Sequence, residues 1–143
     1  MNTKRSFAML VVVSMSILGL VTTIWAETHE VSLKADKSHE RAGGTLLLSD
    51  DSVSVEAEGL RPNGVYTVWF VNMKPKKHEA GAGEAPYMFK TDGEGYGSYT
   101  SSLKESPFGK WQMVMIVLHV NGDPRNMKDM VPALSAPVPK SHH

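Results

Sequence analysis

Short stretches in which apolar and polar residues alternate follow one another along this chain, and they constrain its fold more than any other feature. Val53, Val55 and Ala57 alternate with polar residues, which is typical of a strand with one buried face. Turn signals such as Asp92-Gly93 separate the stretches, because glycine adopts positive φ without steric cost. The pattern predicts eight strands, at residues 29–35, 44–49, 53–58, 64–73, 86–91, 96–103, 111–120 and 131–138.

No helical pattern is longer than one turn, so we expect an all-β fold, an immunoglobulin- or fibronectin-like Greek-key sandwich of seven or eight strands. The one long connection, residues 74–85, is expected to lack regular structure and to be either mobile or functional. Ten side chains are expected in the core: Leu46, Val55, Leu60, Tyr66, Val68, Phe70, Phe89, Val114, Ile116 and Leu118.

The N-terminal residues have the organisation of a secretory signal peptide. Lys4 and Arg5 precede an uncharged run from Phe7 to Ile24, and Ala26 supplies a small residue at the expected cleavage point. We therefore expect a signal peptide at 1–26, a β-sandwich domain at 27–139 and a disordered tail at 140–143. The apolar run is near the roughly 18 residues that also suit a membrane span, so an uncleaved anchor is the alternative. Either way, the sequence predicts a periplasmic or secreted domain, with membrane contact only if the leader is uncleaved.

Composition excludes several classes of site. The chain has no cysteine, which removes disulfides, thiolate nucleophiles, zinc–thiolate sites and a blue-copper centre. Lys4 and Arg5 belong to the leader, which leaves 13 basic against 15 acidic residues and a net charge of −2. A nucleic-acid partner is not expected, because it would require a clustered basic surface.

The segment Leu60-Arg61-Pro62-Asn63-Gly64-Val65-Tyr66 has the form Leu-x-Pro-x-x-x-Tyr. In this pattern the leucine closes the bottom of the core, the chain crosses between sheets, and the tyrosine hydroxyl bonds back to the backbone a few residues upstream. It resembles the tyrosine corner of fibronectin type III domains.

A wider resemblance rests on four segments in order: VYTVWFV from Val65, FKTDGEG from Phe89, VLHVNGDP from Val117 and ALSA from Ala133. They resemble the extracytoplasmic sandwich domain of the anti-sigma-K factors, over about residues 60–138. The resemblance implies a binding or sensor-like sandwich. We expect no cytoplasmic sigma-binding domain ahead of the leader, so a transcriptional role is not carried over, and fold analogy alone does not fix function.

Strands 64–73 and 111–120 are expected to carry apolar residues on both faces, whereas the outer face of an antiparallel sandwich is usually polar. This outward face has three interpretations. The 74–85 loop covers it as a second small core with methionine as filler, or it binds a partner, or it binds a soft metal such as Cu(I). The expected partner surface is Trp69, Met73, Trp111, Met113 and Met115. The candidate metal ligands are Met73, His78, Met88, Met113, Met115 and His119.

No constellation indicates catalysis. His119 and Asp123 are close in sequence but separated by a turn, and the acidic turns supply too few oxygen ligands for calcium. We therefore expect an exported, non-enzymatic binding or interaction domain of the bacterial cell envelope, with no cofactor, whose partner is an envelope protein or a small ligand. The alternative is a periplasmic copper-handling protein with methionine and histidine ligands.

Overall fold

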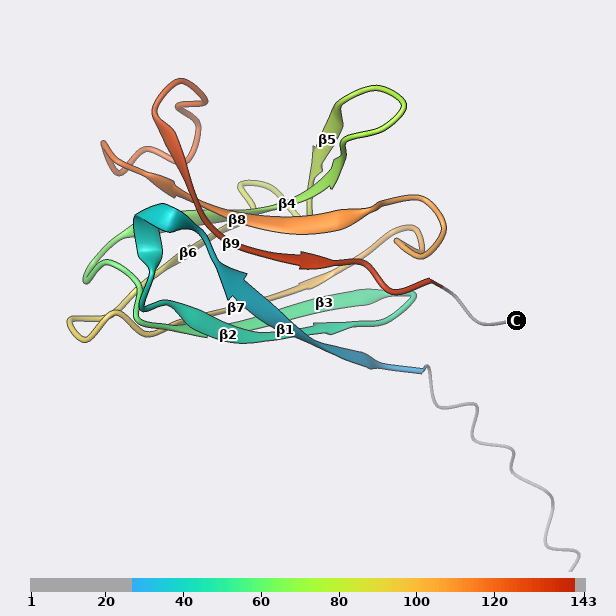
Figure 1. The fold of residues 1–143 in the computed structure, drawn as a ribbon, viewed down its shortest axis with the longest axis horizontal. Helices are drawn as coiled ribbons and strands as arrows, with labels where there is room; N and C mark the ends of the chain where they lie inside the picture. Colours follow the sequence, from blue (N-terminus) through green and yellow to red (C-terminus); the bar gives the residue numbers. More distant parts are fainter. Residues whose placement is uncertain (1–26, 141–143) are drawn as a thin grey trace, which may run out of the picture.

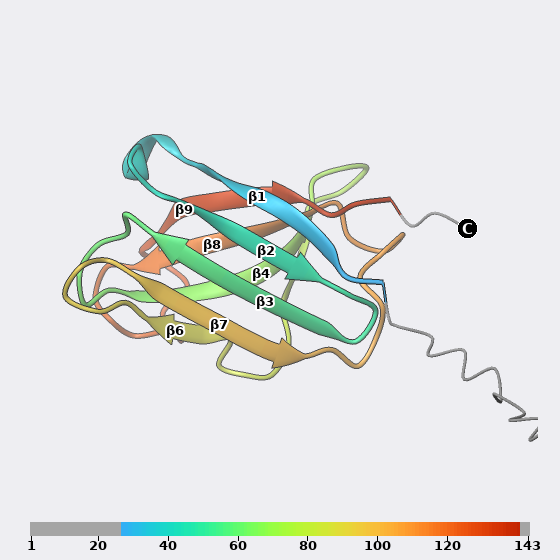
Figure 2. The same ribbon diagram turned by 90° about the horizontal axis from the view of Figure 1, so that it is seen from below.

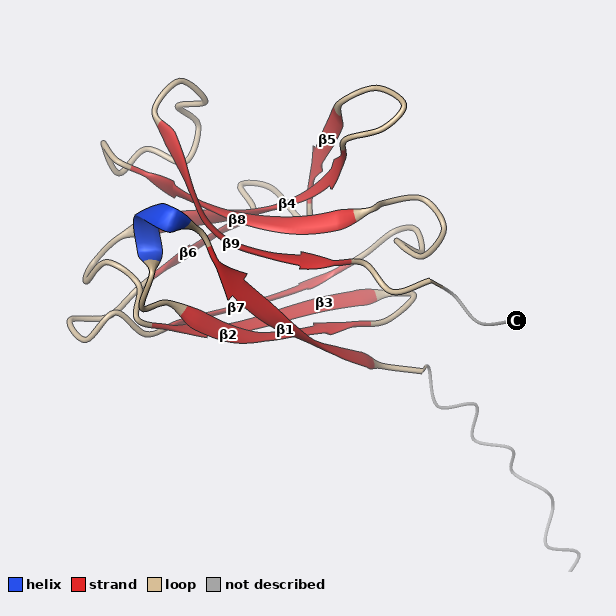
Figure 3. Ribbon diagram, in the orientation of Figure 1, coloured by secondary structure: helices blue, strands red, loops and turns tan. Residues whose placement is uncertain are grey.

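Nine β-strands and one 3-10 turn make up the regular structure of residues 27–140, which are the residues that the computed structural model describes (Figures 1 and 3). The expected leader, residues 1–26, and the tail residues 141–143 lie outside the described residues. The elements are β1 (His29–Ala35), η1 (Lys37–His39), β2 (Gly43–Leu48), β3 (Ser52–Glu58), β4 (Val65–Asn72), β5 (His78–Gly81), β6 (Met88–Lys90), β7 (Gly97–Ser102), β8 (Met113–His119) and β9 (Met130–Pro137).

The strands pair in the order β5-β4-β8-β9-β1-β2-β3-β7, with β6 also beside β4, and the described pairings are antiparallel. Strand β1 joins the two halves of this sheet. Residues 29–33 pair with β2, whereas Lys34 and Ala35 pair with β9. The sheet therefore curls, and Figure 2 shows β1, β2, β3 and β7 in front of β4, β8 and β9.

The core lies between the two halves, and the prediction of its membership is confirmed. All ten expected residues are buried and belong to one cluster. Strand β3 shows the cause, because Val53, Val55 and Ala57 face the core while the intervening residues are more exposed. Burying one such valine, leucine or phenylalanine contributes about 1.5–3 kcal/mol. In the absence of disulfides, these contacts have to hold the domain together.

The eight expected strands are found, with ends that differ by one or two residues at most positions. The prediction of an all-β chain is confirmed, whereas its assignment as an immunoglobulin-like Greek-key sandwich stays a prediction. The expectation that residues 74–85 lack regular structure is wrong, because β5 forms there and pairs with Trp69 to Asn72 of β4. The free edge of β4 supplies hydrogen-bonding partners for this polar stretch, which has no strand pattern of its own.

Strand β8 begins at Met113 and not at Trp111. Residues 107–111 form a turn in which the amides of Lys110 and Trp111 both donate to the Pro107 carbonyl. Further along, the β8–β9 register shifts between Ile116 and Val117, and Ala133 is the extra residue. The Ala133 carbonyl accepts from the Asp36 amide at 2.9 Å, so this bulge receives the end of β1.

A chain of hydrogen bonds fastens η1 to the core. The Tyr66 hydroxyl accepts from the Arg61 amide at 2.9 Å and lies 3.0 Å from His39 Nε2. His39 Nδ1 lies 2.7 Å from Ser38 Oγ, which donates to the Pro132 carbonyl. Because the Ser38 proton is used there, His39 Nδ1 is the donor to Ser38 and Nε2 accepts from Tyr66. Burial lowers the pKa of His39, although Asp36 opposes this effect.

Candidate functional site

The outer faces of β4 and β8 carry mostly apolar side chains. Tyr66, Val68 and Phe70 belong to the core cluster, so the alternate residues of β4 point away from the core. Trp69 pairs with Met115 and Val71 pairs with Met113. Residues directly opposite each other in an antiparallel pair have Cβ atoms about 4.5–5.5 Å apart, so the two outward rows are in contact.

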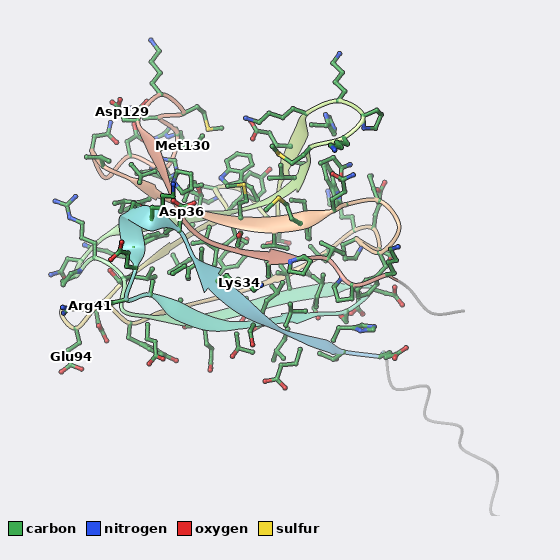
Figure 4. All side chains as sticks on the ribbon, viewed as in Figure 1. Lys34, Asp36, Arg41, Glu94, Asp129 and Met130 are labelled. Carbon is green, nitrogen blue, oxygen red and sulfur yellow. The ribbon has the colours of Figure 1, made fainter. Side chains whose placement is uncertain are left out.

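Two projections rise from this outer face (Figure 1). One is the β5 arm, residues 74–81, which contains β5. The other is the β8–β9 connection, residues 120–129. Figure 4 shows Asp129 and Met130 on the β8–β9 projection, with Asp129 farther from the sheet than Met130. Four outward side chains are buried between and beneath these projections, although they are not part of the core cluster: Thr67, Val71, Val117 and His119.

A groove of about 250 Å³ lies on the outer face between the two projections. Trp69 and Met73 line it from β4 and its extension, Met115 lines it from β8, and Met130 and Pro132 line it from β9. Met73 is 54% exposed, whereas Met115 and Met130 are half-buried. The groove therefore has one well-exposed methionine and two partly covered ones in its lining.

Val71 and Val117 also line the groove, and two charged side chains, Lys77 and Glu79, line it from the β5 arm. Glu79 pairs with Val71 in the sheet, and this register places its side chain on the outer face. The two charges are opposite in sign, so the lining carries no net charge and is otherwise apolar.

The Trp69 indole is held by a buried chain of hydrogen bonds. Its Nε1–H donates to Thr67 Oγ1 at 2.7 Å, and Thr67 Oγ1 lies 2.7 Å from His119 Nε2. His119 Nδ1 lies 3.0 Å from the Asn126 carbonyl of the β8–β9 connection. A carbonyl can only accept, so Nδ1–H is the donor, Nε2 is an acceptor and the Thr67 hydroxyl donates to it. The chain therefore fixes one wall of the groove to the β8–β9 connection.

The Tyr87 ring also contacts Trp69, with ring centroids 5.6 Å apart and planes inclined at 55°.

Ala82, next to the β5 arm, is held by two hydrogen bonds. Its amide donates to the Val68 carbonyl at 2.9 Å, and its carbonyl accepts from the Tyr99 hydroxyl at 2.6 Å. Burial raises the pKa of Tyr99, which keeps this hydroxyl protonated and able to donate.

The structure brings two of the six candidate metal ligands, Met73 and Met115, into the groove. Met113 lies on the same face opposite Val71, and Met88 lies on β6 opposite Thr67; neither lines the groove. His119 is 2% exposed, and both of its ring nitrogens are engaged in hydrogen bonds.

His78 and Trp111 lie together, apart from the groove. The His78 ring stacks on the Trp111 ring with centroids 5.3 Å apart, and Trp111 stacks on Phe70 with centroids 5.9 Å apart. Phe70 is a core residue, and Trp111 packs against the core cluster. The expected strand at 111–120 would have placed Trp111 on the outer face with Met113 and Met115, but the later start of β8 turns it toward the core.

Sequence reasoning missed four lining residues: Lys77, Glu79, Met130 and Pro132. Lys77 and Glu79 belong to the segment 74–85, which was expected to lack regular structure and therefore had no predicted face. Met130 is the first residue of β9, a proline-containing strand whose register depends on the bulge at Ala133, which no local pattern indicates. The sequence signal that could have pointed to Met130 is the concentration of methionines between Met113 and Met130.

Two larger depressions, of about 540 and 580 Å³, are bordered by charged side chains such as Lys37, Arg41, Lys74 and Lys110. Among the described residues, no three His, Cys, Asp or Glu side chains gather as metal ligands would. Within residues 27–140 the structure has no helix long and apolar enough to cross a membrane.

No family model, curated protein or solved structure matches the sequence.

Proposed function

We propose that this chain is an exported, non-enzymatic binding domain of the bacterial cell envelope, and that the groove beside Trp69 is its binding site. The observation that carries this proposal is the apolar outer face of β4 and β8. The outer face of an antiparallel sheet is usually polar, and a contiguous apolar surface rimmed by polar groups is typical of an interaction site. Here the surface is also concave, and Trp69 in its wall is held by Thr67 and Tyr87.

The proposed fold is an immunoglobulin- or fibronectin-like sandwich with a tyrosine corner. Its support is the curled sheet around one core, together with the buried Tyr66 whose hydroxyl bonds to the Arg61 amide. The resemblance to the anti-sigma-K extracytoplasmic domain agrees with a binding role. The case against catalysis rests on His119, because the bonds to Thr67 and Asn126 use both ring nitrogens and leave neither for a substrate.

Export is tested by the mature N-terminus. The protein, expressed with its own leader and recovered from the envelope fraction, should begin at Glu27. A chain that keeps residues 1–26 and sediments with membranes would support the anchor alternative, and a chain found in the cytoplasm would contradict export.

Occupancy of the groove is tested by methionine oxidation in intact cells. Met73 lines the groove and is 54% exposed, whereas Met127 lies outside the groove and is 44% exposed. With the purified protein, a brief peroxide treatment should oxidise both at comparable rates. In cells, an occupant of any chemistry should protect Met73 relative to Met127.

The ratio of the two sulfoxides is measured by mass spectrometry at low conversion and is independent of protein amount. An unchanged ratio between cells and purified protein would contradict the groove as a site occupied in the cell. A copper-handling role is the second candidate, and the observation that favours it is that two of the candidate ligands, Met73 and Met115, line the groove.

A further inference from the structure

A depression beside η1 lies at one end of the domain (Figure 1) and shares no residue with the groove. We call it the η1 depression. Lys37, His39 and Arg41 line it from η1 and the turn that follows, and Arg61 lines it from the β3–β4 connection. Residues of β8 and β9 close its inner side. The depression therefore joins segments from both halves of the sheet.

Positive charge predominates in this lining. Lys37, Arg41 and Arg61 are set against one carboxylate, that of Glu40. With histidine neutral, the lining carries a net charge of +2, whereas the domain that follows the leader carries −2. Within residues 27–140, none of the three cations forms an ion pair. Like charges that are brought together repel one another, so a bound anion would stabilise this arrangement.

Two of the three arginines that follow the leader line the η1 depression. Gly59 allows their two segments to approach, because it has a φ of +68° and a Cβ there would overlap the Arg41 carbonyl oxygen. The planar guanidinium group presents paired N–H donors that match the oxygens of a carboxylate or a phosphate. Arg41 and Arg61 are thus the side chains best suited to hold an oxyanion here.

The two walls that carry these arginines are fixed to each other. His39 Nε2 lies 3.0 Å from the Tyr66 hydroxyl, and that hydroxyl accepts from the Arg61 amide at 2.9 Å. Tyr66 is fully buried, so the connection passes through the core. Asp36 lies close enough to act on His39 electrostatically, but it does not line the depression. Walls that are already ordered reduce the cost of ordering them when a ligand binds.

The inner side of the depression is apolar. Leu60 and Leu118 belong to the core cluster, and Val131 packs against it. The volume is about 540 Å³, within the range of about 300–1,000 Å³ that is typical of sites for small organic ligands. An inorganic ion would leave these side chains without a contact, whereas an organic anion would use both parts of the lining.

We propose that the η1 depression binds a small organic anion. A carboxylate or phosphate group of the ligand accepts hydrogen bonds from Arg41 and Arg61, and its apolar group lies against Leu118 and Val131. This inference goes beyond the proposed function, because it assigns a second site whose lining is separate from that of the groove.

The test is an NMR titration of the isotope-labelled protein, expressed with its own leader, purified, and followed through its backbone amide resonances. The probes are hexanoate and hexyl phosphate, which carry the two kinds of oxyanion on the same apolar chain, and hexanol is the neutral control. The test variant is Arg41→Gln with Arg61→Gln. The matched control is Lys90→Gln with Lys104→Gln, which removes the same charge from exposed positions outside both linings.

At least one of the two anions should shift the amide resonances of residues 37–41 and 59–61 until they saturate, and hexanol should give no saturable shift. The arginine variant should weaken this binding by about tenfold or more, because hydrogen bonds to charged groups are among the strongest in proteins. The lysine control should retain the affinity. Both arginines are exposed, and substitutions at such positions usually have small effects on stability, so the variant should keep its dispersed amide spectrum.

Four results would overturn the proposal: no saturable shift with either anion, saturable shifts centred on other residues, equal shifts with hexanol, or an equal loss in the arginine and lysine variants. Failure here does not imply failure of the proposed function. Protection of Met73 in cells reports on the groove alone, because Met73 does not line the η1 depression.

Discussion

Trp69 on β4 and Met115 on β8 lie directly opposite each other, on the face of the sheet that points away from the core. A cross-strand pair of this kind would ordinarily face solvent. Here the β5 arm and the β8–β9 connection rise from the same face, and the pair lines the groove between them. The proposed function depends on this relationship.

Thr67 is the central member of the buried chain that positions Trp69. Thr67→Val conserves shape but leaves the indole N–H and His119 Nε2 without their partner. An unsatisfied buried polar group costs about 1–3 kcal/mol, so the free energy of unfolding should fall by at least about this amount in urea denaturation. Thr67→Ser keeps the hydroxyl and should lose much less. Equal losses in the two variants would contradict the role of the hydroxyl.

The Tyr66 hydroxyl joins the Arg61 amide to His39. Tyr66→Phe keeps the ring, which stacks on Phe89 with centroids 5.5 Å apart, and removes both hydrogen bonds. We expect a loss of about 1–3 kcal/mol in the free energy of unfolding, measured by urea denaturation. A loss within experimental error would show that water replaces the hydroxyl at no cost.

Acid should destabilise the fold through His39. Burial lowers the pKa of His39 from its ordinary value of 6.5 in the folded state, so the unfolded chain binds more protons between the two pKa values. Stability therefore falls as pH drops below about 6.5 and levels off below the folded-state pKa. Protonation also conflicts with the acceptor role of Nε2 toward Tyr66.

The matched variant for this pH effect is His39→Gln, which cannot titrate. The free energy of unfolding of the natural protein should fall more steeply between neutral pH and pH 5 than that of the variant, because the other histidines are common to both. Parallel pH profiles would contradict the assignment to His39.

Gly81 leaves room for the Tyr87 ring. A Cβ at position 81 would overlap that ring, so Gly81→Ala should displace Tyr87 and change the environment of Trp69. The expected result is a shift of the Trp69 indole N–H resonance, with the Trp111 resonance as the internal reference. Gly93→Ala is the control, since a Cβ there has no neighbour within 4 Å. An unmoved Trp69 resonance would show that Tyr87 does not position the indole.

The core could be predicted from the sequence because alternation is a local signal. Val53, Val55 and Ala57 indicate their own burial, and the face of β4 follows from Tyr66 being inward. The same logic placed Trp69, Met113 and Met115 on the outer face. Strand β5 could not be predicted in this way, because its pairing is determined by the free edge of β4 and not by its own residues.

The site was only partly predictable, because its shape depends on contacts between segments distant in sequence. His119 has the right chemistry for a ligand, but the β8–β9 connection folds over it and Asn126 takes one ring nitrogen. Trp111 is an even number of residues from Met113 and Met115, so an unbroken strand would place it on the same face. Because Trp111 belongs to the turn at 107–111, this alternation does not reach it. Met130 reaches the groove only because β9 pairs with β8 across a bulge.

Occupancy of the groove beside Trp69 is tested most directly by the oxidation of Met73 relative to Met127, because both side chains are exposed and, of the two, Met73 alone lines the groove. The ratio of Met73 sulfoxide to Met127 sulfoxide should be lower in intact cells than in the purified protein. An equal ratio in the two samples would contradict the groove as a site that is occupied in the cell.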